Sequence, residues 1–160
     1  MNKVTRRSFV KNIGLGVGSA AILPTLVSFE NSSLLREIPY TGKKMNIALC
    51  GLGRYANILA TGLQETEFCS LAGIITGTPE KAKNWKAKYQ IPDENIYNYE
   101  NFDEISKNKN IDLVYVVLPN GMHKEFTIRA AEAGKHVIVE KPMANTAAEC
   151  KQMIDTCNKA

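Results

Sequence analysis

The chain has 160 residues, of which 44% are hydrophobic and 22% charged, a composition typical of one globular domain of ordinary size. Its formal charge of +4 comes from four basic side chains within the first eleven positions, and the charges of the rest balance. A balanced charge without a basic stripe argues against a nucleic-acid-binding surface, so no nucleic acid partner is expected.

Residues 1–30 resemble an export signal. The segment 5–11 reads Thr-Arg-Arg-Ser-Phe-Val-Lys and precedes an apolar stretch at 13–27. The whole pattern is similar to the twin-arginine (Tat) signal that carries folded proteins across a bacterial membrane. The alternative is an ordinary basic N-terminus followed by a buried helix. We expect export to the periplasm, and an N-terminal membrane tether stays open because no clear cleavage site is visible. Residues 31–44 are expected to form a polar linker.

A glycine turn follows the first predicted strand, Met45–Cys50, and opens a helix predicted at 56–64. The G-x-G-x-x-A pattern of a dinucleotide site is formed by Gly51, Leu52, Gly53, Arg54, Tyr55 and Ala56. Gly51 allows the tight turn, Gly53 leaves the backbone open to a diphosphate, and the small Ala56 lets helix and strand pack closely. We expect the diphosphate on the N–H groups at the positive end of this helix.

Strands and helices alternate along the rest of the chain. Further strands are predicted at 68–75, Ile96–Tyr97, 111–118 and His136–Val139, and helices at 79–89, 102–106, 122–133 and 147–158. Thr78, Asn101 and Thr146 are expected to cap the helices that follow them. Successive strand–helix units predict an α/β fold over residues 45–160, a Rossmann-type doubly wound parallel sheet with helices on both faces.

The cysteine pattern shows neither a disulfide framework nor a C-x-x-C pair. We interpret all four cysteines as small buried hydrophobic side chains: Cys50, Cys69, Cys150 and Cys157. Neither His123 nor His136 has a partner at metal-ligand spacing, so no metal is expected.

The end of the second predicted strand bears on the choice of cofactor. NAD sites usually place an acid there to accept hydrogen bonds from the ribose hydroxyls, whereas this chain has Thr76 and Gly77. Small side chains leave room for a 2′-phosphate, Lys81 can reach back to it, and Arg54 can cover the adenine edge. The pattern favours NADP. NAD stays open, because the negative charge of Glu80 weakens the positive electrostatic potential at this site and the Lys81 side chain can equally be solvated.

Glu140-Lys141-Pro142 follows the last predicted strand. Ligands of open α/β sheets bind at the carboxyl ends of the strands, so Lys141 is expected in a dry cleft beside the nicotinamide. Its amine can act there as a base toward a hydroxyl or as a hydrogen-bond donor to the resulting carbonyl oxygen. Glu140 is expected to orient Lys141 or hold the strand end, and Pro142 to fix the backbone, with a cis bond as one option. Taken alone, a lysine here is also compatible with a solvated loop.

Together these motifs resemble the Gfo/Idh/MocA oxidoreductase family, and within it the glucose–fructose oxidoreductases. The similarity is carried by residues 51–56, Leu118-Pro119-Asn120 with His123, and residues 130–144. It implies an NAD(P)-dependent enzyme that transfers hydride to or from a sugar or polyol, with Lys141 as the catalytic residue. The cofactor-binding residues are then Gly51, Leu52, Gly53, Arg54, Tyr55, Thr76, Gly77, Lys81, Leu118, Pro119, Asn120, His123, Glu140 and Lys141. For His123 the alternative is a cap of its own helix.

The same resemblance implies a second α+β domain, which in this family supplies substrate contacts. The similarity covers residues 45–160 and stops inside the helix after Lys141, so we expect a chain truncated before that domain, with nucleotide binding but little turnover. The complete protein is expected to be a homo-oligomer. Two alternatives stay open: a glycoside-cleaving relative that uses a bound nicotinamide for transient oxidation, and a non-catalytic nucleotide-binding module.

Overall fold

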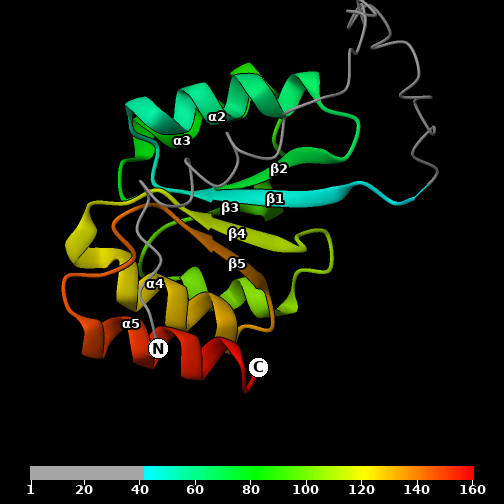
Figure 1. The fold of residues 1–160 in the computed structure, drawn as a ribbon. Helices are drawn as coiled ribbons and strands as arrows, with labels where there is room; N and C mark the ends of the chain where they lie inside the picture. The colour runs from blue at the N-terminus through cyan, green and yellow to red at the C-terminus, as the bar shows by residue number, and fades with distance from the viewer. Residues whose placement is uncertain (1–41) are drawn as a thin grey trace, which may run out of the picture. The chain divides into compact units, whose positions relative to one another are not determined.

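The computed structural model describes residues 42–160; the twin-arginine segment and most of the predicted linker lie outside the described residues. The described part contains a five-stranded sheet in the order β3-β2-β1-β4-β5, with all neighbours parallel. Its strands are β1 (Met45–Cys50), β2 (Cys69–Ile75), β3 (Ile96–Tyr97), β4 (Leu113–Val116) and β5 (His136–Val139). The chain winds outward from β1 first to one side and then to the other, which confirms the predicted doubly wound sheet (Figure 1).

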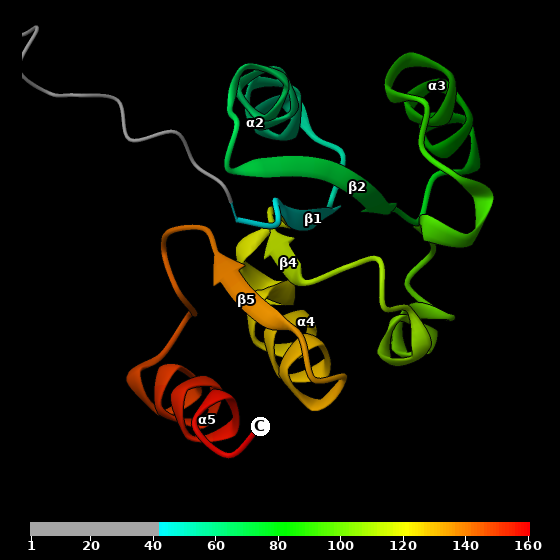
Figure 2. The same ribbon diagram turned by 90° about the vertical axis from the view of Figure 1, so that its right-hand side faces the viewer.

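Helices cover both faces of this sheet, as Figures 1 and 2 show. One face carries α2 (Arg54–Glu65) and α3 (Pro79–Tyr89). The other carries the 3-10 helix η3 (Phe102–Lys107) and α4 (Asn120–Glu132), and α5 (Ala147–Cys157) packs against α4. A further 3-10 turn, η2 (Asp93–Asn95), leads into β3. No helix within residues 42–160 has the length and apolarity needed to cross a membrane.

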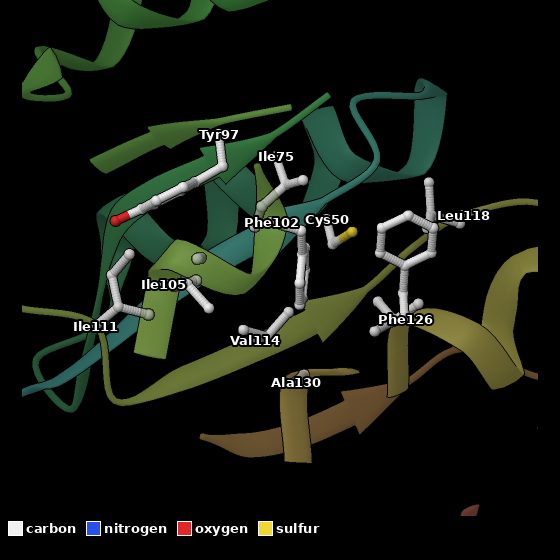
Figure 3. Packing of buried hydrophobic residues seen from close by; sticks show 12 residues of the cluster. Cys50, Ile75, Tyr97, Phe102, Ile105, Ile111, Val114, Leu118, Phe126 and Ala130 are labelled. Carbon is white, nitrogen blue, oxygen red and sulfur yellow. The ribbon is translucent and has the colours of Figure 1, made fainter. Parts of the chain in front are cut away.

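Two apolar clusters fill the space between the sheet and its helices. Successive residues of β1 point to opposite faces, so Leu49 packs with α2 and α3 whereas Cys50 packs with η3 and α4. Figure 3 shows the second cluster, in which Phe102 of η3 and Phe126 of α4 meet edge to face with 5.2 Å between ring centroids. Burial on both faces explains why the central strands are apolar at almost every position.

Local signals in the sequence set several helix ends. Pro79 occupies the first turn of α3, as predicted. Gly134, with φ of 69°, follows the end of α4. At the start of α5, the Thr146 hydroxyl accepts the amide hydrogen of Glu149, and the Glu149 carboxylate accepts that of Thr146, each at 3.2 Å. This reciprocal capping box confirms the predicted cap at Thr146.

Other predicted boundaries and caps differ from the structure. α2 and α4 each begin two residues earlier than predicted, because the preceding turns pass directly into the helices. β4 is shorter than the predicted 111–118, since its pairing with β1 ends at Cys50↔Val116. Thr78 and Asn101 stand at N-cap positions, but neither side chain bonds to its helix. The Asn101 Oδ1 instead accepts the amide hydrogen of Asn98 at 2.8 Å.

The prediction that all four cysteines are buried is wrong for Cys157, which is exposed. Cys50 is buried, and Cys69 and Cys150 are only half-buried. All four are free thiols. The difference at Cys157 has a simple cause: α5 packs mainly against α4, so only a narrow stripe that includes Met153 is covered.

Candidate functional site

The carboxyl ends of the strands lie along one edge of the sheet. The Val117 amide donates to the Cys50 carbonyl at 2.8 Å, and the Glu140 amide donates to the Val116 carbonyl at 3.0 Å. These bonds hold the ends of β1, β4 and β5 in line. The winding direction reverses between β1 and β4, and this switch point is where open α/β sheets bind their ligands.

The glycine turn after β1 has a conformation that requires its first glycine. Gly51 has φ of 100°, and a Cβ added there would lie 2.8 Å from the Val117 carbonyl oxygen. Gly53 is different, because no atom lies within 4 Å of the position its Cβ would take. Ala56 is fully buried in the cluster between α2 and the sheet. The turn is therefore tight at Gly51 and open at Gly53, as a bound diphosphate needs.

α2 and α4 both begin at this edge without a side-chain cap. Their N-cap residues are Gly53 and Pro119, and neither helix has an acid in its first turn. The first amides of each helix lack partners within the helix and form the positive end of its dipole. The start of α2 in particular is suited to an anion, because Gly53 leaves it uncovered. The residues present thus fit the diphosphate of a dinucleotide.

The end of β2 is built differently. Thr76 is 5% exposed, and its Oγ1 accepts the amide hydrogen of Thr78 at 3.2 Å. The ring of Tyr99 lies over Gly77, where an added Cβ would be 2.8 Å from Tyr99 Cε2. A groove of about 540 Å³ lies beside them, lined by Thr76, Gly77, Pro79, Tyr97, Asn98 and Tyr99 among others. Lys81 is exposed in the first turn of α3 and is not among the lining residues.

Glu140 connects the end of β5 to its neighbours. The Tyr115 hydroxyl donates to Glu140 Oε1 at 2.6 Å, and the Lys141 amide donates to Oε2 at 3.2 Å. The bond from Tyr115, more than any other cause, lowers the pKa of Glu140. Burial first, and the adjacent carboxylate next, raise the pKa of Tyr115. Tyr55, at the start of α2, adds a smaller contribution to both pKa shifts. A neutral phenol therefore donates to an ionised carboxylate at this edge.

Lys141 lies directly after this carboxylate and is exposed, and its bond to Pro142 is cis. Within residues 42–160 its ammonium forms no salt bridge with a carboxylate. The dry cleft expected around Lys141 is not formed by the described residues alone, because no element among them covers its side chain.

His123 is the buried ionisable group of this region, with 1% of its surface exposed. Its Nε2 lies 2.7 Å from the Leu118 carbonyl oxygen, and its Nδ1 lies 2.8 Å from the Pro142 carbonyl oxygen. The contact with Leu118 is local but does not cap α4, because its partner is a carbonyl oxygen and the N-terminus of α4 has no side-chain cap. The contact with Pro142 reaches the loop after β5, which the sequence did not predict.

Most of the predicted residues meet along the edge. They come from the turn at 51–55, from Thr76-Gly77, from residues 118–120 and from Glu140-Lys141, whereas Lys81 stands apart on α3. Two tyrosines were missed, Tyr99 over Gly77 and Tyr115 beside Glu140. Tyr115 pairs with Ile138, so it lies next to the end of β5. This strand pairing cannot be predicted from a single sequence. Among the described residues, no group of three or more His, Cys, Asp or Glu side chains could hold a metal.

Comparison with known proteins gives the class to which this fold and edge belong. Residues 45–160 match the profile of an oxidoreductase family with an NAD-binding Rossmann fold. The chain belongs to this family, the Gfo/Idh/MocA oxidoreductases, as the resemblance of its motifs implied. Its described residues form the family's NAD(P)-binding domain.

Similar proteins include several enzymes of sugar and polyol chemistry. The aldose-aldose oxidoreductase of Caulobacter crescentus, solved with glycerol, is 49% identical, with a TM-score of 0.72 over 73% of this chain and 35% of its own. The apo scyllo-inositol dehydrogenase of Lactobacillus casei is 26% identical, with a TM-score of 0.64 over 73% of this chain and 34% of its own. An alpha-N-acetylgalactosaminidase of Shewanella oneidensis is 28% identical over 99% of this chain and 38% of its own. The chain thus spans between a third and two fifths of the length of these proteins.

Proposed function

We propose that the chain is the nucleotide-binding part of an oxidoreductase that acts on a sugar or polyol by hydride transfer. The observation that carries this proposal is the start of α2, uncapped and left open by Gly53 at the switch point of the sheet. The turn at 51–55 would hold the diphosphate, and residues 118–120, at the start of α4, would border the nicotinamide end. The similarity to the aldose-aldose oxidoreductase supports an aldose or related polyol as the substrate class.

NADP is the cofactor that the end of β2 favours. No acid directly follows β2 to bind free ribose hydroxyls, and the groove beside Thr76 and Gly77, whose lining also includes Glu100, gives a 2′-phosphate space. Lys81 would supply the positive charge from the first turn of α3. Lys81→Ala should weaken NADP binding and leave NAD binding unchanged, measured as Kd values by calorimetry. Lys83→Ala, two residues further along α3, is the matched control. Equal losses for both cofactors would contradict this role of Lys81.

Lys141 is the proposed catalytic group. A bound nicotinamide supplies the hydride donor or acceptor. Lys141 would take a proton from the substrate hydroxyl during oxidation, or donate a hydrogen bond to the carbonyl oxygen that forms. The carboxylate of Glu140 is engaged by Tyr115 and by the Lys141 amide, so the ammonium is not held in a salt bridge with it. This arrangement leaves the amine available to a substrate.

Replacement of Lys141 in the complete protein tests this assignment. Lys141→Ala should abolish NADP reduction by aldoses while the Kd for NADP changes little, because the side chain acts on the substrate. Lys151→Ala, on the exposed face of α5, controls for the loss of one positive charge. Turnover that survives in Lys141→Ala would overturn the assignment, whereas the absence of turnover in the wild-type protein would favour a non-catalytic nucleotide-binding module.

Glycoside cleavage through a transient oxidation is the second candidate. It is favoured by the similarity to the alpha-N-acetylgalactosaminidase, which extends over nearly the whole chain. Product analysis separates the two functions. A sugar oxidoreductase yields an oxidised sugar together with an equal amount of reduced cofactor or, where a second sugar takes up the hydride, of reduced sugar, whereas the glycosidase yields a free alcohol and sugar and no oxidised sugar.

We also propose that residues 1–30 direct export through the Tat pathway. Arg6 and Arg7 within the segment 5–11, followed by the apolar stretch at 13–27, support this. Lys at both positions conserves the charge but not the guanidinium pair, so the doubly substituted protein should stay in the cytoplasm. Its distribution between cell fractions is the measurement, and export at the wild-type level would contradict the proposal.

A further inference from the structure

We propose that His123 is a positioning residue, which fixes the backbone of Lys141 by joining the loop after β5 to the start of α4. The proposal rests on the catalytic role proposed above for Lys141. It gives a buried histidine of α4, which the resemblance implied as a cofactor-binding residue, a part in the reaction through the backbone of Lys141.

The hydrogen bonds on either side of Lys141 carry the argument. On its N-terminal side, the Glu140 amide donates to the Val116 carbonyl at 3.0 Å, and the β4–β5 ladder stops there. On its C-terminal side, the Pro142 carbonyl oxygen lies 2.8 Å from His123 Nδ1. Lys141 therefore lies between two fixed points of the backbone. The Glu140 amide is bonded to β4, and the Pro142 carbonyl contacts His123 of α4. Its exposed side chain projects from a backbone that cannot shift without breaking one of them.

The second ring nitrogen fixes the imidazole itself. His123 Nε2 lies 2.7 Å from the carbonyl oxygen of Leu118, the residue before the N-cap of α4. Both partners are carbonyl oxygens, which only accept, so a neutral ring donates to one of them, and its tautomer decides which. With 1% of its surface exposed, the ring has no room to rotate away from these partners. The position of Lys141 is thereby tied to the turn that is proposed to border the nicotinamide.

Two substitutions separate this role from one limited to the local contact with Leu118. The side-chain amide nitrogen of Asn lies two bonds from Cβ, as Nδ1 of His does. The side-chain amide nitrogen of Gln lies three bonds from Cβ, as Nε2 of His does. His123→Asn therefore keeps the donor toward Pro142, and His123→Gln keeps the donor toward Leu118. A positioning role predicts that the Gln variant is impaired and the Asn variant is not; a role limited to the contact with Leu118 predicts the reverse.

The experiment compares both variants with the wild type by kinetics and by NMR. In the complete protein, His123→Gln should lower kcat for aldose oxidation about tenfold or more, with the Kd for NADP within about twofold. His123→Asn should stay within about threefold of wild-type kcat. In the 160-residue chain, the Lys141 amide signal should move in the Gln variant and stay in place in the Asn variant.

Equal losses of kcat in both variants, or a loss in the Asn variant alone, would overturn the proposal. If the wild-type protein oxidises no aldose, the proposed function fails, and the Lys141 amide signal still decides whether the link exists. If neither variant folds, the ¹⁵N spectrum of the wild-type imidazole decides. A hydrogen on Nδ1 supports the link to Pro142, and an Nδ1 without hydrogen rules it out.

Discussion

The Tyr115 hydroxyl donates a hydrogen bond of 2.6 Å to the carboxylate of Glu140. This bond crosses from β4 to the residue that follows β5, and the other carboxylate oxygen accepts the amide hydrogen of Lys141. A side chain in the middle of a predicted strand thus controls the charge next to the proposed catalytic lysine. The carboxylate stays ionised because the bond from Tyr115 lowers its pKa.

Tyr115→Phe should raise the pKa of Glu140 toward its ordinary value of 4.5. Because folding lowers this pKa, the ionised carboxylate stabilises the folded chain above pH 4.5, and this contribution disappears as the pH falls through the lowered value. The variant should therefore be less stable than the wild type at neutral pH, and the difference should shrink in acid. Urea unfolding across this pH range, together with NMR titration of Glu140, measures both effects.

Tyr97→Phe is the matched control for this prediction. The Tyr97 hydroxyl donates to the Glu94 carbonyl at 2.9 Å and accepts from Asn108 Nδ2 at 2.9 Å, so its removal costs two hydrogen bonds but leaves Glu140 untouched. A Glu140 titration that is the same in Tyr115→Phe as in wild type would show that the hydroxyl does not hold the carboxylate.

The two glycines of the turn should respond differently to substitution by alanine. Gly51→Ala forces a side chain into a left-handed conformation beside the Val117 carbonyl, which should cost about 1–3 kcal/mol of stability or more. Gly53→Ala meets no atom within 4 Å and should change stability by less than about 1 kcal/mol.

Nucleotide affinity separates the same two variants further. The added methyl of Gly53→Ala stands where the diphosphate is proposed to lie, so the Kd for NADP should rise about tenfold or more in a chain that is still folded. Thermal unfolding and NADP titration of both variants make the comparison. Unchanged affinity in Gly53→Ala would place the diphosphate elsewhere.

Sequence patterns predicted the order and type of the strands and of the helices other than η2, because several starts and stops have a local cause. Pro79 opens α3, Gly134 follows α4, and Thr146 forms the capping box of α5. Strand length could not be predicted in the same way. The apolar run continues past the end of β4 through Val117 and Leu118, but the strand stops where its partner β1 stops, at Cys50↔Val116. The end of β4 is therefore set by its pairing with β1 and cannot be predicted from the sequence of β4 alone.

Gly62→Ala should stabilise the chain by about 0.5–1 kcal/mol. Gly62 lies inside α2, is exposed, and has no atom within 4 Å of the position of an added Cβ. Alanine there lowers the conformational entropy of the unfolded chain without a clash in the helix. A urea midpoint at or below that of the wild type would contradict the prediction.

Thiol labelling should distinguish the cysteines by their environments. Cys157 is exposed and should react with iodoacetamide in the native chain, whereas Cys50 is buried and burial raises the pKa of its thiol. Cys50 should react only when the chain unfolds. Peptide mass spectrometry with and without urea gives both rates, and labelling of Cys50 as fast as Cys157 without urea would show that the core is open.

The candidate site was partly predictable for a similar reason. The turn at 51–56 and Glu140-Lys141-Pro142 are contiguous motifs, so a single sequence reveals them. The contacts of Tyr115 with Glu140 and of His123 with Pro142 join residues 25 and 19 positions apart. They depend on the register of β4 with β5 and on where α4 begins, which emerge only from the assembled sheet.

Titration of the ¹⁵N-labelled chain with NADP tests the central claim most directly. We predict saturable shifts of the amide signals of residues 51–56, at the start of α2, accompanied by those of Thr76, Gly77 and Asn120. A well-dispersed spectrum that does not change at any NADP concentration, or that changes only far from the glycine turn, would contradict the assignment of this edge as a dinucleotide site.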